Sequence, residues 1–394
     1  MNTYDKIANL GQVFTPESIV SEMLGLKKNN GTVLEPSCGN GVFLNHLNNA
    51  TGIEIDPTYK GKNILNIDFF DYNIKEKFDT IIGNPPYVRF NDISKQTQSK
   101  LDKSLFDNRS NLYLFFIYKC ILHLKPHGEL IFITPRDFLK STSSINLNKF
   151  IYDSGTITDL IDLGDKKIFG DYTPNCIIWR FEKDNFTRKT STYKEFILSN
   201  GQLLFTNNQY PIQFNEVFFV KVGAVSGADK IFSNDKYGNA DFVCSFTAKT
   251  NKTKKMIFNK KTEYLNQFRD ALIKRRIKKF DEGTWWQWGR LHYQSEEKRI
   301  YVNCKTRNKE PFFLHSSNYY DGSVLAVFPK NQKLNLKELC DKLNKVNWFE
   351  LGFVCDGRFI FSQKSLENCL LPEEFIKYKM ADKQRPLLAD SIKS

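Results

Sequence analysis

The chain has 394 residues, of which 41% are hydrophobic, and we expect two domains because single cores seldom grow beyond about 250 residues. No stretch approaches the ~20 consecutive apolar residues that a membrane helix needs, and Met1–Asp5 lacks the basic-then-apolar order of a secretory signal. We therefore expect a cytoplasmic protein. Eight scattered cysteines, without a CxxC pair or a nearby histidine cluster, indicate neither a metal site nor a disulfide framework.

The net charge of +13 is distributed unevenly along the chain. Residues 1–180 contain 20 basic and 20 acidic side chains, so the whole excess lies in residues 181–394. A neutral half followed by a basic half suggests that the second half meets a polyanion. A solvated basic surface would have the same composition, so both interpretations stay open on charge alone.

From residue 32 onward, short apolar runs alternate with longer amphipathic segments. Gly41–Asn48 and Leu112–Leu124 are predicted helices, and Lys125–Gly128 is predicted to end the second helix in a turn. The predicted strands are Thr32–Glu35, Thr51–Ile55, Ile64–Asp68, Thr80–Gly83, Glu129–Thr134, Thr158–Leu163 and Cys176–Phe181. This alternation predicts an α/β fold with a mainly parallel sheet, whose ligands bind at the carboxyl ends of the strands.

A hairpin and a domain boundary follow these segments. Tyr193–Leu198 and Leu203–Thr206 flank Asn200-Gly201, which is a strong hairpin turn. The neighbourhood of Pro211 looks like the boundary between the halves. The predicted domains are therefore residues 1–210 and 211–394.

A glycine-rich turn lies directly after the first strand, in Val33–Gly41. Glycines let the backbone approach a ligand closely, and the N-terminus of a following helix offers free N–H groups. Leu44 stands where a third glycine would complete GxGxxG, which counts against a pyrophosphate-binding dehydrogenase.

Acidic residues end the next two strands. Glu54 is placed to accept hydrogen bonds from both hydroxyls of a ribose. Asp68 could accept from an adenine amino group while Phe69 covers a face of the ring. Each acid alone would be an ordinary strand-end carboxylate, but together with the glycine turn they predict a nucleoside pocket at one edge of the sheet.

The apolar strand ending at Gly83 leads straight into Asn84-Pro85-Pro86-Tyr87. The prolines stiffen this turn and remove two donors, which leaves the Pro85 carbonyl and the Asn84 side-chain oxygen as acceptors beside the flat Tyr87 ring. Two acceptors and a stacking ring suit a planar amino group on a π system. Hydrogen bonds from both amino protons favour the tetrahedral, more nucleophilic nitrogen and stabilise the charge that develops on it during methyl transfer.

In these motifs and their order, most of residues 10–182 resembles the gamma-order N6-adenine DNA methyltransferases. The resemblance implies a Rossmann-like, mainly parallel seven-stranded methyltransferase sheet, a C-terminal α+β target-recognition domain, S-adenosylmethionine as cofactor and no metal. It also implies that Asn84, Pro85, Pro86 and Tyr87 are catalytic. The cofactor-binding residues that it implies are Phe14, Thr15, Pro16, Glu35, Pro36, Ser37, Cys38, Gly39, Gly41, Glu54, Ile55, Asp68, Phe69 and Asn84.

The same resemblance implies that the target adenine is flipped out of the duplex, because the stack hides its amino group. Tyr87 would pack on one face of the flipped base and Phe169 on the other, with Tyr172 as a rival to Phe169. The polar segment Asn91–Ser110 is predicted to be a mobile surface loop that closes over the base or its sugar-phosphate backbone.

Three segments of the basic half are candidates for DNA contact. Lys221–Lys230 resembles the opening of a target-recognition region, Phe268–Phe280 is predicted to be an amphipathic helix with a basic outer face, and Thr284–Arg290 contains three tryptophans. A solvated helix face and a tryptophan core are the competing interpretations. The candidate DNA-binding residues are Arg89, Lys274, Arg275, Arg276, Trp288, Arg290, Lys305 and Arg307.

We therefore expect a monomeric, nucleoid-associated enzyme that methylates adenine in double-stranded DNA, either within a restriction-modification system or alone. The tetrapeptide chemistry also fits the amino group of cytosine, and amino groups in RNA or protein. An inert methyltransferase fold that serves as a DNA-binding specificity module is the non-enzymatic alternative. The motif at Phe14–Pro16 and the basic second half favour DNA, and the complete set of site residues favours an enzyme.

Overall fold

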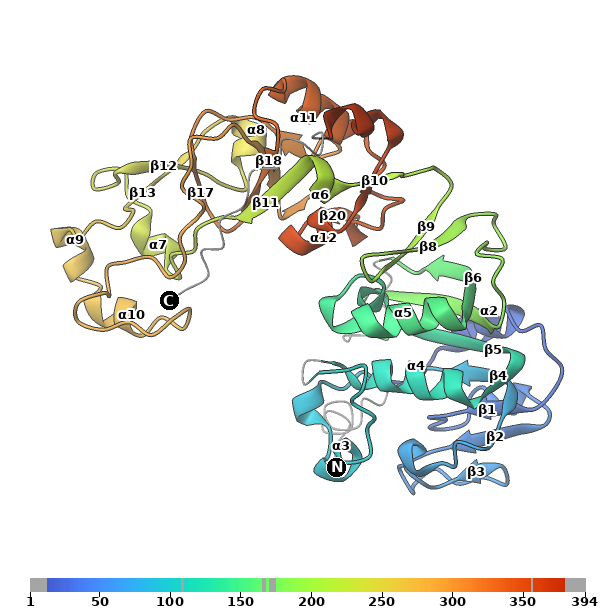
Figure 1. The fold of residues 1–394 in the computed structure, drawn as a ribbon. Coiled ribbons are helices and arrows are strands. Elements are labelled where there is room, and N and C mark those ends of the chain that lie inside the picture. The colour runs from blue at the N-terminus through green and yellow to red at the C-terminus, as the bar shows by residue number, and fades with distance from the viewer. Residues whose placement is uncertain (1–12, 108–109, 165–167, 170–174, 356, 380–394) are drawn as a thin grey trace. The chain divides into compact units, whose positions relative to one another are not determined.

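The computed structural model describes residues 13–107, 110–164, 168–169, 175–355 and 357–379. It divides into two compact units, and the division lies between Asn207 and Asn208, close to the expected boundary after residue 210. Figure 1 shows the first unit in blue to green and the second in yellow-green to red. Among the described residues, no helix is long and apolar enough to cross a bilayer.

The first unit is built on a seven-stranded sheet with the order β3-β2-β1-β4-β5-β7-β6. Strands β1 to β5 are parallel to one another, whereas β7 is antiparallel to both β5 and β6. The strands are β1 (Val33–Glu35), β2 (Ala50–Ile53), β3 (Ile64–Leu65), β4 (Phe78–Gly83), β5 (Leu124–Pro135), β6 (Gly155–Asp162) and β7 (Cys176–Lys183). The prediction of a mainly parallel seven-stranded sheet is confirmed.

The centre of this sheet is buried on both faces, which explains its continuous apolar runs. Ile81 and Ile82 of β4 and the stretch Leu130–Ile133 of β5 are fully buried. Helix α4 (Leu112–His123) packs against β5, and α5 (Ile145–Ser154) packs against α4 and β6. Helix α2 (Glu17–Gly25) contacts β5 as well (Figure 1).

Two local predictions in this unit are wrong. Gly41–Asn48 forms only a 3-10 turn at Leu44–His46, because Gly41 adopts a left-handed φ of +74° and the asparagines after it are poor helix formers. Lys125–Gly128 is not a turn between two elements, because β5 already begins at Leu124. These four residues form an irregularity in the pairing with β4, where His127 has a φ of +58°.

The predicted hairpin is confirmed. Strands β8 (Glu195–Ser199) and β9 (Gln202–Thr206) are antiparallel, and Ser199 pairs with Gln202 across a two-residue turn. Asn200 and Gly201 have φ values of 47° and 76°, which are the two positive values that such a tight turn requires.

The second unit combines small, mostly antiparallel sheets with short helices, in agreement with the α+β expectation. Its main sheet has the order β11-β18-β14-β16 and its other sheets have the orders β13-β12-β17, β15-β20-β19 and β10-β21. The strands are β10 (Ile212–Gln213), β11 (Phe218–Val222), β12 (Ala240–Val243), β13 (Lys254–Met256), β14 (Ile300–Asn303), β15 (Lys305–Thr306), β16 (Phe312–Phe313), β17 (Tyr319–Tyr320), β18 (Val324–Pro329), β19 (Val354–Cys355), β20 (Arg358–Ile360) and β21 (Leu370–Leu371). The helices are α6 (Phe214–Val217), α7 (Asp229–Phe232), α8 (Thr247–Thr250), α9 (Glu263–Asn266), α10 (Arg269–Ile273), α11 (Leu336–Lys345) and α12 (Gln363–Glu367).

The prediction of one helix over Phe268–Phe280 is wrong. Helix α10 ends at Ile273, and the following residues run as an irregular segment. The cause lies in Arg275, which turns into the interior instead of outward and donates from Nε to the carbonyl of Leu272 at 2.7 Å. A buried guanidinium two residues after the end of α10 cannot belong to the exposed basic face that the periodicity indicates.

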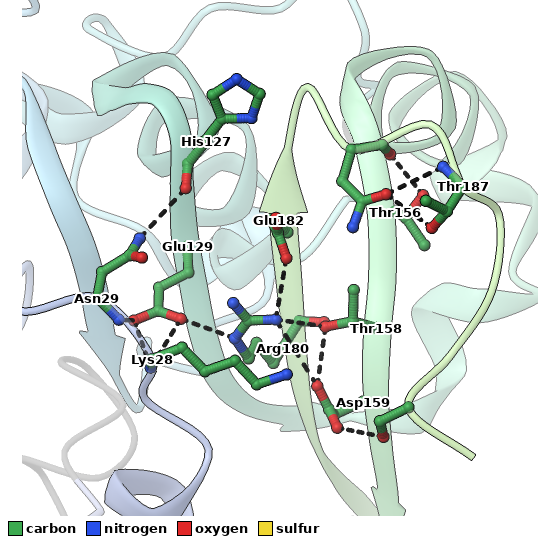
Figure 2. Close-up of polar contacts among 12 residues, drawn as sticks. Lys28, Asn29, His127, Glu129, Thr156, Thr158, Asp159, Arg180, Glu182 and Thr187 are labelled. Carbon is green, nitrogen blue, oxygen red and sulfur yellow. Dashed lines mark hydrogen bonds and ion pairs between the residues drawn. The ribbon is translucent and has the colours of Figure 1, made fainter. Parts of the chain in front are cut away.

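A buried polar cluster connects β4, β5, β6 and β7 of the sheet (Figure 2). The carboxylate of Glu129, which is fully buried, accepts from Arg180 Nε at 2.7 Å and from the Thr80 hydroxyl at 2.9 Å. It also accepts from the backbone N–H groups of Lys28 and Asn29 at distances between 2.9 and 3.1 Å. The chain leaving α2 is thereby tied to the sheet.

Candidate active site

A cavity of about 200 Å³ lies at the carboxyl ends of the parallel strands. Of the fourteen residues predicted to bind a cofactor, twelve line it: Phe14, Thr15, Glu35, Pro36, Ser37, Cys38, Gly39, Glu54, Ile55, Asp68, Phe69 and Asn84. Pro16 and Gly41 do not. The Pro16 carbonyl accepts from the backbone N–H groups of Ile19 and Val20 in the first turn of α2, and Gly41 shapes the turn that follows Cys38.

Glu54 joins the glycine turn to the end of β2. Its Oε2 accepts from the backbone N–H of Gly39 at 2.7 Å, and its Oε1 accepts from the N–H of Asp56 at 2.8 Å. Burial raises the pKa of Glu54 above its usual range, although these backbone donors oppose the shift. Because each carboxylate oxygen can accept more than one hydrogen bond, Glu54 retains capacity for the hydroxyls of a ligand.

Glu35 presents an unsatisfied acceptor in the same wall. Its side chain is buried, and Oε2 has no hydrogen-bond partner among the described residues. Burial raises the pKa of Glu35 well above its usual range, and the neighbouring Glu54 carboxylate raises it further. A buried carboxyl oxygen without a partner costs folding free energy unless a hydrogen-bond donor or a cation pairs with it. A ligand ammonium group would supply such a partner.

Asp68 is engaged more heavily than the sequence suggests. Its Oδ1 accepts from the backbone N–H of Phe70 at 3.0 Å, and its Oδ2 accepts from the Thr97 hydroxyl at 2.9 Å and from Lys100 Nζ at 3.1 Å. Next to it, Phe69 is buried with its ring stacked on Phe116. An acceptor and an aromatic ring thus lie together at the end of β3, as expected.

Thr97 and Lys100 belong to the segment Asn91–Ser110, and sequence reasoning missed their link to the cavity. The segment contains the short helix α3 (Lys95–Gln98), and Ile93, Ser94 and Thr97 line the cavity. No local sequence pattern predicts that this segment lines the cavity, because the hydrogen bond from Thr97 to Asp68 joins residues about thirty positions apart. Its predicted mobility stays a prediction.

Asn84 follows β4 and is held from the N-terminal side of the chain. Its Nδ2 donates to the Val13 carbonyl and to the Thr15 hydroxyl, both at 3.2 Å. This orientation leaves Oδ1 buried, with no hydrogen-bond partner in the part of the chain that the structure describes. The backbone carbonyl of Asn84 accepts from the Ser37 hydroxyl at 3.2 Å, which joins the tetrapeptide to the glycine turn.

Tyr87 and Phe169 lie together, but not as two parallel plates. Their ring centroids are 6.5 Å apart at an interplanar angle of 67°, and the Tyr87 hydroxyl donates to the Ile133 carbonyl at 2.9 Å. A base stacked between two rings needs about 7 Å between parallel faces, twice the ~3.4 Å spacing of stacked bases. Tyr87 and Phe169 do not form such a slot in this structure. The rival Tyr172 lies outside the described residues.

The predicted DNA-binding residues separate by exposure. Arg89, Lys274, Arg276, Arg290, Lys305 and Arg307 are exposed. The structure corrects the prediction that Trp288 contacts DNA, because this residue is only 1% exposed in the core of the second unit and its Nε1 donates to the Ile257 carbonyl at 2.8 Å. It also corrects the prediction for Arg275, whose side chain is buried and donates to backbone carbonyls.

A mainly parallel seven-stranded sheet with one antiparallel strand, carrying a cavity at its carboxyl edge, defines the first unit as an S-adenosylmethionine-dependent methyltransferase fold. Residues 29–169 match the family described as Eco57I restriction-modification methylase. This part of the chain is thus similar to restriction-modification DNA methylases.

Individual relatives differ in how much of their length is matched. Type II methyltransferase M.HindII of Haemophilus influenzae is 28% identical over 92% of this chain and 89% of its own. Type II methyltransferase M.HincII of Haemophilus influenzae is 38% identical over 45% of this chain and only 38% of its own. The solved structure of the Type IIL restriction-modification enzyme MmeI in complex with DNA has a TM-score of 0.58 at 13% identity, over 93% of this chain and 64% of that one, and shows similarity of fold.

Proposed function

We propose that this chain transfers a methyl group from S-adenosylmethionine to the exocyclic amino group of an adenine in double-stranded DNA. The observation that carries the proposal is the Asn84 amide, whose nitrogen is held by Val13 and Thr15 while its buried oxygen has no partner among the described residues. A preorganised acceptor is what an aromatic amine requires, because its lone pair is otherwise delocalised into the ring.

The proposed reaction forms a nitrogen–methyl bond as the sulfur–methyl bond breaks. When bound, S-adenosylmethionine supplies a methyl group on a positively charged sulfur. The Asn84 oxygen and the Pro85 carbonyl would accept the two amino protons, hold the nitrogen in line and stabilise its developing positive charge. The methylated nitrogen then loses one proton to solvent, so the site needs neither a general base with a tuned pKa nor a metal.

The cavity residues support the choice of cofactor. Glu54 would accept from the ribose hydroxyls, Asp68 from the adenine amino group with Phe69 beside the ring, and Glu35 would meet the methionine ammonium group. Glu35 fits this last role because it holds a buried oxygen without a partner among the described residues. A second carboxylate capable of the same role is absent from the immediate sequence of the glycine turn, Pro36–Gly41.

Duplex DNA as substrate is supported by the family, by the basic second half and by the exposed Arg89 directly after the tetrapeptide. The target base would be flipped to lie between Tyr87 and Phe169. Because these rings now meet edge to face, the proposal includes a rearrangement of this pair when the base enters.

Transfer of labelled methyl from S-adenosylmethionine to duplex DNA, RNA and a protein extract, assayed in parallel, tests the proposal. We expect label in duplex DNA alone. Label in RNA or protein with none in DNA would contradict it, and label in DNA as N4-methylcytosine would replace adenine by cytosine as the target. Binding of DNA without transfer to any acceptor would favour the specificity module.

A further inference from the structure

The segment 274–279, between α10 and the tryptophan-rich loop, contains five cationic residues in six positions. Lys274, Arg276, Lys278 and Lys279 are exposed, and none of them forms an ion pair with a described residue. The fifth, Arg275, is buried. Four solvated cations therefore surround one that faces the interior.

Arg275 fastens this segment to two other loops. Its guanidinium donates from Nη1 to the carbonyl of Ser226, and from Nη2 to the carbonyls of Trp285 and Gln287 at 2.6 and 2.9 Å. The planar guanidinium points its N–H groups at these carbonyls in fixed directions. A lysine ammonium on its flexible chain could not make the same set of directed hydrogen bonds. Burial lowers the pKa of Arg275 to about 10, so it stays protonated at neutral pH.

Packing fixes the same segment from both sides. Ile277 lies so close to the backbone of Gly227 and Gly289 that a Cβ at either position would clash with it, at 2.6 Å from Ile277 Cγ2 in the case of Gly289. Phe280 is buried and stacks on the Arg275 guanidinium, 3.8 Å from its ring centroid. Arg275 and Phe280 hold the irregular path from the interior, and Ile277, which is 41% exposed, covers the two glycines from the surface.

We infer that residues 274–279 form a preformed phosphate-binding loop for duplex DNA, and that Arg275 is the positioning residue that holds its exposed cations in place. The inference rests on the proposed function, because it takes DNA as the partner. Four exposed cations on a fixed path can each pair with a phosphate of a duplex, and phosphate contacts contribute affinity and orientation without reading the base sequence.

The test is the salt dependence of binding to a duplex of random sequence, measured with the full chain. Each phosphate contact contributes about −0.9 to the slope of log affinity against log salt concentration. In the double variant Lys278→Ala/Lys279→Ala, the slope should become shallower by about 1.8, for two lost contacts. Lys364→Ala removes an exposed cation on α12, which lies far from α10 in Figure 1, and should leave the slope unchanged.

Arg275→Lys separates positioning from charge, because lysine keeps the positive charge but cannot make the directed hydrogen bonds of the guanidinium. We expect the salt-dependence slope to become shallower by more than about 0.9, the contribution of one phosphate contact, although the net charge is unchanged. A wild-type slope in Arg275→Lys would overturn the positioning role, and a wild-type slope in the double variant would overturn the loop as a DNA site. If Arg275→Lys does not melt cooperatively, the double variant alone decides. If the wild-type chain binds no duplex at all, the proposed function itself fails.

Discussion

At the scale of single residues, the Asn84 amide shows how a remote part of the chain prepares a reacting group. Thr15 and Val13 fix which end of the amide faces the cavity, although about seventy residues separate them from Asn84. The sequence motif names the acceptor, but only the fold shows that its nitrogen is occupied and its oxygen free among the described residues.

Replacing Asn84 by Ala should lower turnover by about two orders of magnitude or more and leave the dissociation constant of S-adenosylmethionine nearly unchanged, because the lost acceptor acts mainly in the transition state. Single-turnover kinetics and equilibrium cofactor binding measure the two quantities. Asn84→Asp keeps an acceptor oxygen and should retain more activity than Asn84→Ala. Collapse of cofactor affinity in the alanine variant would make Asn84 structural.

The raised pKa of Glu35 predicts that cofactor binding depends on pH. A ligand ammonium beside Glu35 favours the carboxylate, so the pKa of Glu35 should be lower in the complex than in the free protein. Between these two pKa values, binding releases a proton, and affinity should rise with pH by up to about tenfold per unit. Above the pKa of the free protein, titration of Glu35 should contribute no further rise in affinity.

Calorimetric titration of the cofactor across this pH range provides the measurement. Glu35→Gln removes the titrating group and should flatten the profile. A profile of equal slope in the wild type and in this variant would show that another group releases the proton, and that Glu35 does not face the ammonium.

At the scale of elements, the pair Glu129–Arg180 shows that the same sheet carries a purely structural polar site. Arg180 also donates from Nη1 to the Thr158 hydroxyl at 2.7 Å, and its side chain is 2% exposed (Figure 2). Breaking a buried pair by removing one partner leaves an uncompensated charge, which costs more than the pair itself contributes.

Replacing Glu129 by Ala should therefore lower the free energy of unfolding by about 3–5 kcal/mol, as measured by urea denaturation. Glu182 is partly exposed, and its Oε2 lies 3.3 Å from Arg180 Nη1. Because solvent screens this contact, Glu182→Gln should lower the free energy of unfolding by less than about 1 kcal/mol. Equal losses in both variants would mean that burial of Glu129 is not what makes the pair important.

The strands and the cavity could be predicted from the sequence because their signals are local. A buried parallel strand is a continuous apolar run, and the residue after each run lies at the carboxyl edge, so Glu35, Glu54, Asp68 and Asn84 could be placed together. The site residues that were missed depend on contacts between positions distant in the sequence. Thr97 donates a hydrogen bond to Asp68 only because the fold brings the two together.

The basic segment shows the opposite failure. Its periodicity favours a helix with outward cations, yet one of these cations has its acceptors in two other loops, and this tertiary demand ends α10 at Ile273. Composition also cannot distinguish a tryptophan that contacts DNA from one that packs in the hydrophobic core, and Trp288 lies in the core. Tertiary hydrogen bonds outweighed local propensity at this position.

At the scale of the whole molecule, charge and chemistry are divided between the two halves of the chain. The first unit carries the cavity and the tetrapeptide, whereas the excess of basic residues lies in residues 181–394. On the proposed function, the second half would bind the duplex and the first would modify it. Neither half alone would then suffice for methylation of a defined site.

The most direct test of the central claim is identification of the modified base by mass spectrometry, after unmethylated duplex DNA is incubated with the full chain and S-adenosylmethionine and digested to nucleosides. We predict N6-methyladenine with the wild-type chain, and a yield lower by about two orders of magnitude or more with Asn84→Ala at equal enzyme and time. Unmodified adenine with the wild-type chain, or equal yields from the two proteins, would contradict it.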